Sequence, residues 1–189
     1  EEKYLSEMQI LLAKSGMMAK TRIVDITNYI MLLTGQPLHA FDYDKFVAVG
    51  GGKTPCIKVR LAKEGEQLEL LDGKTIECIG SDILITSNNV PVALAGAMGG
   101  KNTEIDENTK NILLEAATFS LYNLRKTQMA HGIFSEAITR FTKGVPAGGT
   151  FNVLAEAVKE MNVKPLELRD KIAQPLEVAT VKVTVKEIN

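Results

Sequence analysis

The chain has 189 residues, 45% hydrophobic and 24% charged, a composition that is typical of a globular protein and excludes a disordered one. Its 22 basic and 23 acidic side chains leave a formal net charge of −1, so no global positive field is available to hold a nucleic acid. Any such contact must come from a local patch or a partner chain, and a stand-alone nucleic-acid binder is disfavoured.

The N-terminal part of the sequence predicts two helices. Apolar side chains recur at helical spacing over residues 4–13, and Gly16 is a suitable stop. A second helix is predicted over residues 25–34, with Asp25 as its N-cap and Gly35 just past its end.

The middle of the chain predicts strands. Asp72-Gly73 and Asn88-Asn89 are turn signals between apolar runs, and consecutive hairpins would make the sheet largely antiparallel. The predicted strands are residues 56–61, 67–71, 75–79, 82–86, 90–95 and 111–117.

The remaining elements are predicted to be helices, over residues 120–128, 135–143 and 150–161. Strands followed by helices indicate an α+β fold. We assign residues 1–174 to one domain, and residues 175–189 to a linker and the first strand, at 178–185, of a following, truncated domain. The sequence lacks an initiator methionine, so we expect a piece of a longer polypeptide.

Several classes of site are excluded by composition and spacing. Cys56 and Cys78 lie in apolar runs and are expected to stay unpaired, and with only His39 and His131 no cluster has zinc spacing. Neither Gly-Lys pair fits a phosphate-binding loop. No apolar run is long enough to span a bilayer, so we expect a cytoplasmic protein with no membrane contact.

A few residues stand out, each with a structural and a functional reading. The glycines of residues 96–100 fit a tight turn or a close approach of backbone to a ligand. Glu115 interrupts an apolar strand and either faces solvent or serves a site. His39, in an extended segment after Pro37, is a structural residue or a functional one, and Ser135 is by default an N-cap. The residues alone leave each alternative open.

Taken together, four blocks resemble the central tRNA-editing region, the third and fourth modules, of the beta chain of bacterial phenylalanyl-tRNA synthetase. The combination is specific, although each block alone is weak. The blocks are VDITNY at 24–29 with GQPLHAFD at 35–42; LDG at 71–73; ALAGAMGG at 93–100; and ILLEAA at 112–117 leading to EA at 136–137, RF at 140–141 and KG at 143–144.

The resemblance implies a three-layer β/β/α fold with C-terminal helices and hydrolysis of tyrosine wrongly esterified to phenylalanine tRNA. A pocket built for phenylalanine cannot strongly reject an isostere that merely adds a hydroxyl, so a second, hydrolytic site is needed. By resemblance, Glu115 binds the phenol, His39 orients water or the ester, and Ser135 binds polar atoms. Gly99 and Gly100 open the backbone, and Ala137 limits side-chain size.

The resemblance also implies partners. These are phenylalanine tRNA and a synthetase alpha chain, in an alpha2-beta2 enzyme that uses ATP and Mg²⁺ elsewhere, with no cofactor or metal in this domain. Phe134, Ile138 and Thr142 stand where the family has Arg, Ser and Glu, and Met18–Arg22 replaces a polar run. The alternatives are therefore a non-catalytic scaffold at a subunit interface, with an impaired editing pocket, and a free-standing proofreading protein.

Overall fold

The computed structural model describes residues 6–52 and 54–171. It begins with two helices whose first turns are capped by side chains. Ser6 and Gln9 form a reciprocal capping box on α1 (Glu7–Lys14). Thr21 accepts the N–H of Val24 at the start of α2 (Arg22–Thr34).

The prediction that Asp25 caps the second helix is wrong. Asp25 lies inside the first turn of α2 and is 2% exposed. Its carboxylate accepts the backbone N–H of Lys20 at 2.7 Å and the side-chain amide of Gln9 at 3.1 Å, which ties α1 to α2. The predicted end is confirmed, because Gly35 adopts a left-handed conformation with φ of 78°.

The extended segment around His39 is strand β1 (Leu38–Asp42), and it runs directly into a helix that the sequence analysis missed. This helix, α3 (Tyr43–Val49), starts where the carboxylate of Asp42 accepts the N–H of Lys45 at 2.9 Å. The N-cap aspartate was the available signal, since Asp is among the preferred residues at that position.

Every strand pair in the described residues is antiparallel, in three separate sheets. Strand β1 pairs with β8, β3 pairs with β4, and the four-stranded sheet has the order β2-β5-β6-β7. Besides β1, the strands are β2 (Ile57–Leu61), β3 (Gln67–Glu69), β4 (Thr75–Glu77), β5 (Ile83–Ser87), β6 (Val90–Leu94), β7 (Met98–Gly99) and β8 (Ile112–Ala116).

The expectation of consecutive hairpins is therefore only partly correct. Asp72-Gly73 joins β3 to β4, and Asn88 and Asn89, both with positive φ, join β5 to β6 as predicted. Strand β2 instead pairs with β5, skipping the β3–β4 hairpin. Local turn chemistry identifies the tight hairpins, but it carries no information about the pairing of β2 with β5, which are separated by residues 62–82.

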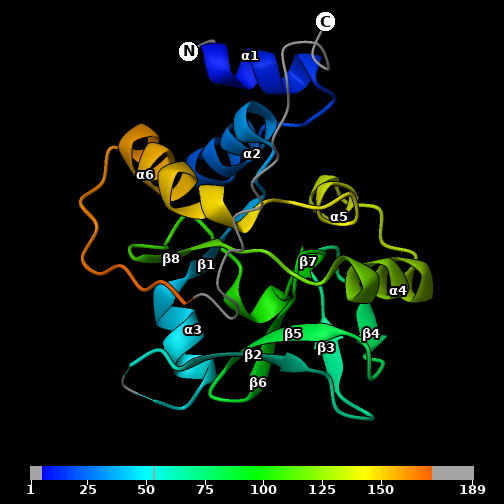
Figure 1. Cartoon of the computed structure of the whole chain (residues 1–189). Coiled ribbons are helices and arrows are strands. Elements are labelled where there is room, and N and C mark those ends of the chain that lie inside the picture. The colour runs from blue at the N-terminus through cyan, green and yellow to red at the C-terminus, as the bar shows by residue number, and fades with distance from the viewer. Residues whose placement is uncertain (1–5, 53, 172–189) are drawn as a thin grey trace, which may run out of the picture.

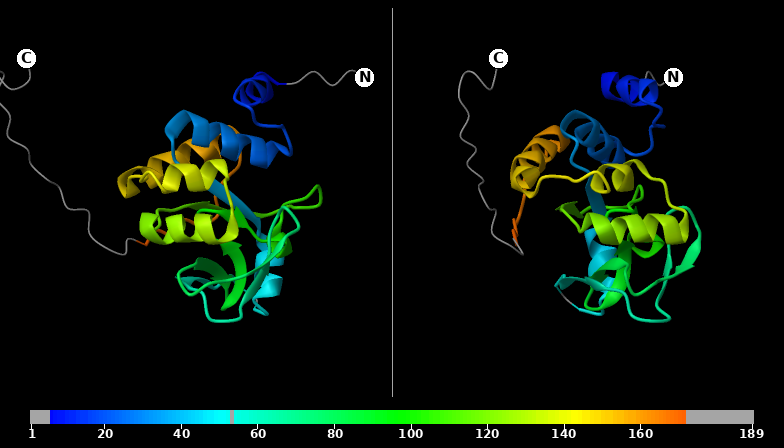
Figure 2. Two further views of the ribbon diagram at one scale, coloured as in Figure 1. Left: turned by 90° about the vertical axis from the view of Figure 1, so that its right-hand side faces the viewer. Right: turned by 45° about the vertical axis from the view of Figure 1, so that its right-hand side comes forward.

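Most of the helices lie on one side of the molecule and the four-stranded sheet on the other, with the β1–β8 ribbon between them, whereas α3 packs beside the sheet (Figures 1 and 2). Helices α4 (Leu121–His131) and α5 (Glu136–Phe141) share an apolar cluster with β3–β6, and α2 and α6 (Thr150–Met161) pack on residues of β1 and β8. Two short 3-10 turns, η1 (Lys101–Thr103) and η2 (Ala147–Gly149), complete the elements of residues 6–52 and 54–171. The α+β prediction is confirmed.

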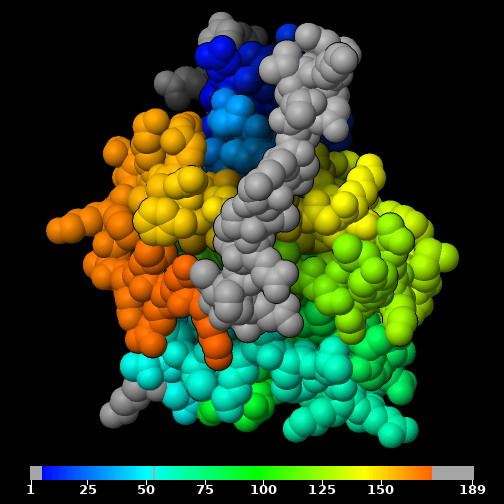
Figure 3. Space-filling view, viewed as in Figure 1, coloured from blue at the N-terminus to red at the C-terminus, as the bar shows by residue number. Residues whose placement is uncertain are grey.

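The space-filling view shows the same layering on one face, with the α5–α6 region in yellow above residues of α3 and β2 in cyan (Figure 3). Cys78 is buried and Cys56 is exposed, and both thiols are free. The predicted strand at 178–185 and the boundary near Gln174 lie outside the described residues.

Candidate functional site

Two of the predicted site residues face each other across the β1–β8 ribbon. The register places His39 directly opposite Glu115, although the two residues are far apart in sequence. Side chains that are opposite each other in an antiparallel pair lie on the same face of the sheet, about 4.5–5.5 Å apart at Cβ. The imidazole of His39 also packs edge-on against the ring of Phe41, with centroids 4.4 Å apart.

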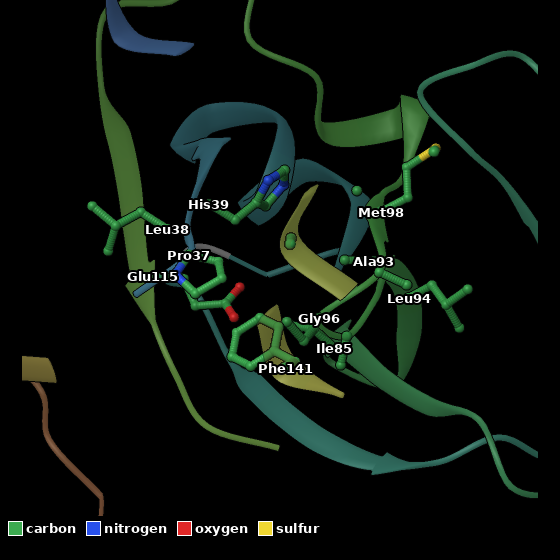
Figure 4. A pocket seen from close by; sticks show the side chains of 14 residues that line it. Pro37, Leu38, His39, Ile85, Ala93, Leu94, Gly96, Met98, Glu115 and Phe141 are labelled. Carbon is green, nitrogen blue, oxygen red and sulfur yellow. The ribbon is translucent and has the colours of Figure 1, made fainter. Parts of the chain in front are cut away.

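A small pocket, with a volume of about 70 Å³, opens in front of this pair. Figure 4 shows His39 and Glu115 entering it from neighbouring strands, with the Glu115 carboxyl group toward the side where Gly96 and Phe141 lie. Residues 93–99 also line the pocket, and all of them except Leu94 and Met98 are alanine or glycine.

Burial keeps both polar side chains of the pocket neutral at pH 7. It raises the pKa of the Glu115 carboxyl to about 8 and lowers the pKa of His39 to about 4, because a charge in this apolar cavity would lose its hydration. A neutral carboxylic acid can both donate and accept a hydrogen bond, and a neutral imidazole can do the same. The pocket therefore offers two amphoteric groups to a polar ligand.

Gly99 is needed because His39 leaves no room for a side chain. A Cβ at Gly99 would lie 2.6 Å from both Cε1 and Nε2 of the imidazole. Gly100 is constrained differently, because its Cβ would meet the carbonyl oxygen of Val92 at 2.6 Å, and its N–H donates to that same carbonyl. Gly99 lines the pocket, whereas Gly100 holds the strand behind it.

Ser135 supports the pocket wall from outside. Its hydroxyl donates to the carbonyl of Ala97 at 2.7 Å and accepts the N–H of Ile138 at 3.2 Å, so the predicted N-cap is confirmed. Ala97 and Ala137 line the cavity, and Ser135 does not.

Four of the six predicted site residues thus surround one pocket: His39, Gly99, Glu115 and Ala137. The chemical roles assigned to all six stay predictions.

Replacing Ser135 by alanine is expected to destabilise the fold by about 1–2 kcal/mol, because the cap of α5 and the bond to Ala97 are both lost. Ser120→Ala is a matched control, since Ser120 also precedes a helix but makes no capping bond with its side chain. Urea unfolding of the two variants measures the difference. Equal stability of both variants would contradict this assignment.

The raised pKa of Glu115 also predicts a specific pH dependence of stability. Between pH 6.5 and 8 the folded state holds the Glu115 proton, whereas the unfolded carboxyl, with a pKa of 4.5, has lost it. The folded state therefore binds more protons, and the free energy of unfolding should fall by about 1–2 kcal/mol across this interval. His39 contributes less and with the opposite sign: its unfolded imidazole, with a pKa of 6.5, gives up about half a proton across this interval, which raises the free energy of unfolding by about 0.4 kcal/mol.

Glu115→Gln should remove this decline, and Glu107→Gln, the same change at an exposed side chain, should keep it. Urea unfolding at pH 6.5 and pH 8 provides the measurement. An identical slope in Glu115→Gln and in the parent chain would show that Glu115 is ionised in the fold.

Sequence reasoning missed several residues of this pocket. Phe41 and Phe141 shape it, the first by contact with His39 and the second as part of its wall. Alternation along β1 places residues 39 and 41 on one face and could have identified Phe41. Phe141 comes from a helix about a hundred residues further along, and no local pattern connects it to the strand.

The substituted family positions lie outside the pocket lining. Ile138 is fully buried in the core beneath α5, and Phe134 is 74% exposed. Thr142 is buried and its hydroxyl donates to the carbonyl of Thr139 at 3.3 Å. These substitutions therefore alter the surroundings of the cavity and leave its wall unchanged.

Among residues 6–52 and 54–171, no group of three or more His, Cys, Asp or Glu side chains could hold a metal ion. Within the same ranges no helix has the length and apolarity required to cross a bilayer.

The fold and pocket define a class of domain that is known in other proteins. The chain belongs to the B3/4 domain family, whose model matches residues 2–162.

Its relatives include phenylalanine–tRNA ligase beta subunits. The subunit from Thermosynechococcus vestitus is 43% identical over 151 residues, which cover 80% of this chain and 18% of the relative. Those from Latilactobacillus sakei and Streptococcus mutans are each 48% identical over 138 residues, covering 73% of this chain and 17% and 16% of the relatives. The chain thus spans less than a fifth of the length of these relatives.

Proposed function

We propose that this chain is the editing domain of a phenylalanine–tRNA ligase beta subunit and hydrolyses tyrosine wrongly attached to phenylalanine tRNA. The observation that carries the proposal is the directly opposed, half-buried pair of His39 and Glu115, both of which line the same pocket. The similarity to ligase beta subunits over about three quarters of the chain supports the class of substrate.

The chemistry of selection follows from the neutral state of Glu115. The phenol hydroxyl of tyrosine can donate to one oxygen of the protonated carboxyl group and accept from the other. Phenylalanine has no hydroxyl, so binding it would leave a buried polar group without a partner. A site built to bond a hydroxyl rejects the analogue that lacks it by up to about 10⁴–10⁵-fold.

The chemistry of hydrolysis needs no nucleophilic side chain. Neutral His39 can accept a hydrogen bond from a water molecule and hold it near the ester, and positioning of this kind contributes strongly to rate. Because its pKa is lowered to about 4, His39 is a weak base, so we assign it the orientation of the water and not its deprotonation. Backbone N–H groups in the 93–99 wall are candidates to stabilise the oxyanion, each worth about 2.7–4 kcal/mol.

The remainder of the enzyme supplies the substrate. We propose that the complete ligase pairs the beta subunit with an alpha subunit, two copies of each, binds phenylalanine tRNA and forms the ester with ATP and Mg²⁺ at a separate site. No metal or cofactor takes part in the step proposed for this pocket.

The experiment is a test for futile cycling. The complete ligase, given tyrosine, ATP and tRNA(Phe), is expected to keep consuming ATP while little tyrosyl-tRNA accumulates. ATP consumption that stops once the tRNA is charged with tyrosine would contradict the proposal.

One observation favours the scaffold alternative. Edge strand β2 exposes three alternate apolar side chains, Ile57, Val59 and Leu61, each about half accessible to solvent. A surface of this kind is typical of a contact with another protein surface. An enzyme that assembles normally but allows tyrosyl-tRNA to accumulate would support the scaffold alone.

A further inference from the structure

A second pocket lies between the end of α2, the end of α5 and the start of α6. Its volume is about 340 Å³, within the range of about 300–1,000 Å³ that is usual for small-ligand sites. Its wall includes Gln36, Arg140, Lys143, Gly149 and Val153. Neither the family and relatives named above nor the sequence motifs assign a role to this pocket.

One side of this pocket is electropositive. Lys143 is exposed and forms no ion pair with any residue in the described ranges. Arg140 holds Glu136 with Nη1 at 2.6 Å, and the described residues supply no partner for its other nitrogens. The first turn of α6 borders the same space, and no side chain caps it. Two cations and a helix N-terminus together favour a phosphate.

The other side offers a buried acceptor that lacks a donor. Gln36 is 4% exposed, and its amide nitrogen donates to the carbonyls of Pro37 at 3.0 Å and Ala117 at 2.9 Å. These bonds fix the orientation of the amide, so Oε1 is the atom left without a hydrogen-bond donor among the described residues. A buried acceptor of this kind needs an explanation, and a ligand hydroxyl would satisfy it.

The second pocket adjoins the first. Gln36 and Arg140 line the second pocket, and the residues that follow them in sequence, Pro37 and Phe141, line the first. A ligand long enough to extend beyond the second pocket could therefore reach the first pocket, which Glu115 lines.

We infer that the second pocket binds a ribose-phosphate unit of the RNA strand whose aminoacylated end enters the first pocket. Lys143, Arg140 and the start of α6 hold the phosphate, and Gln36 accepts from a ribose hydroxyl. This inference rests on the proposed function, since it takes the strand to be the 3′ end of the tRNA. It also explains how a chain with a net charge of −1 can bind RNA locally.

The test measures binding of a short, fluorescein-labelled single-stranded RNA with a free 3′ hydroxyl to the 189-residue chain. Lys143→Glu is expected to weaken binding roughly tenfold, whereas Lys126→Glu, the same charge change at an exposed lysine of α4 outside the pocket, should change it less than about twofold. In Lys143→Ala, the slope of log K against log salt between about 50 and 200 mM should fall by about 0.7. Circular dichroism verifies that each variant is folded.

Two further ligands test which chemical groups the second pocket recognises. DNA of the same sequence should bind several-fold more weakly, because it lacks the 2′ hydroxyl. Adenosine monophosphate should compete poorly, and competition equal to that of the RNA would overturn the assignment to a strand. Equal weakening by the two glutamate variants, or no measurable RNA binding by the parent chain, would overturn the site itself.

Failure of this inference can be told apart from failure of the proposed function. The RNA in the binding test carries no ester, so binding through Lys143 can be observed even if the chain hydrolyses nothing. Conversely, hydrolysis of tyrosyl-tRNA with a KM that is unchanged in Lys143→Glu would leave the editing function standing and overturn the second pocket.

Discussion

Replacing Glu115 by alanine is expected to slow hydrolysis of tyrosyl-tRNA(Phe) by about a hundredfold, whereas replacing it by glutamine should leave most of the activity. Both expectations follow from the neutral state of the side chain, whose pKa is raised to about 8 by burial. Glutamine keeps a neutral group that both donates and accepts at the same place. Alanine removes the partner of the phenol hydroxyl and leaves that hydroxyl buried and unbonded.

Single-turnover release of tyrosine from tyrosyl-tRNA(Phe) at pH 7 measures this effect, with phenylalanyl-tRNA(Phe) as the second substrate. The alanine variant should treat the two substrates nearly alike. A glutamine variant as inactive as the alanine variant would mean that an ionised carboxylate is required, and full selectivity in the alanine variant would remove Glu115 from the site.

Gly99→Ala is expected to reduce hydrolysis of both esters by about tenfold to a hundredfold. The new Cβ would meet the imidazole of His39 at 2.6 Å, so the ring must move, and a displacement of about 1 Å in a catalytic group can cost a hundredfold in rate. Because His39 is proposed to hold the water, the loss should appear in the rate constant at saturation more than in selectivity for tyrosine.

Gly80→Ala provides the matched control, since a Cβ at Gly80 meets nothing within 4 Å. Rates of hydrolysis and urea unfolding should be compared for both variants. Normal hydrolysis by a folded Gly99→Ala protein would show that His39 either adapts or takes no part in the step.

The sequence predicts what depends on local chemistry. Helical spacing predicts α6 with its correct bounds, a left-handed glycine ends α2 as expected, and two turn signals place the β3–β4 and β5–β6 hairpins. Each of these features depends on residues within a few positions of one another. Asp25 shows the limit of such reasoning. It was predicted to be the N-cap of α2, but it lies inside the helix, where its carboxylate forms a tertiary hydrogen bond with Gln9.

The site depends on pairings that no local pattern encodes. His39 and Glu115 become neighbours only because β1 pairs with β8, and the β2–β5 pairing that builds the sheet behind the pocket is also non-local. Only the resemblance to a known family therefore indicated, before the structure, that His39 and Glu115 belong to the same site. Neither the neutral state of the pair nor the second pocket could be deduced from it, since both depend on burial.

The most direct test of the central claim is the release of tyrosine from pre-formed tyrosyl-tRNA(Phe) by the complete ligase that contains this chain, beside phenylalanyl-tRNA(Phe). We expect fast release of tyrosine, slow release of phenylalanine, and loss of the difference in Glu115→Ala. Release of neither amino acid above the uncatalysed rate would contradict the central claim and would leave this chain as a structural module of the enzyme.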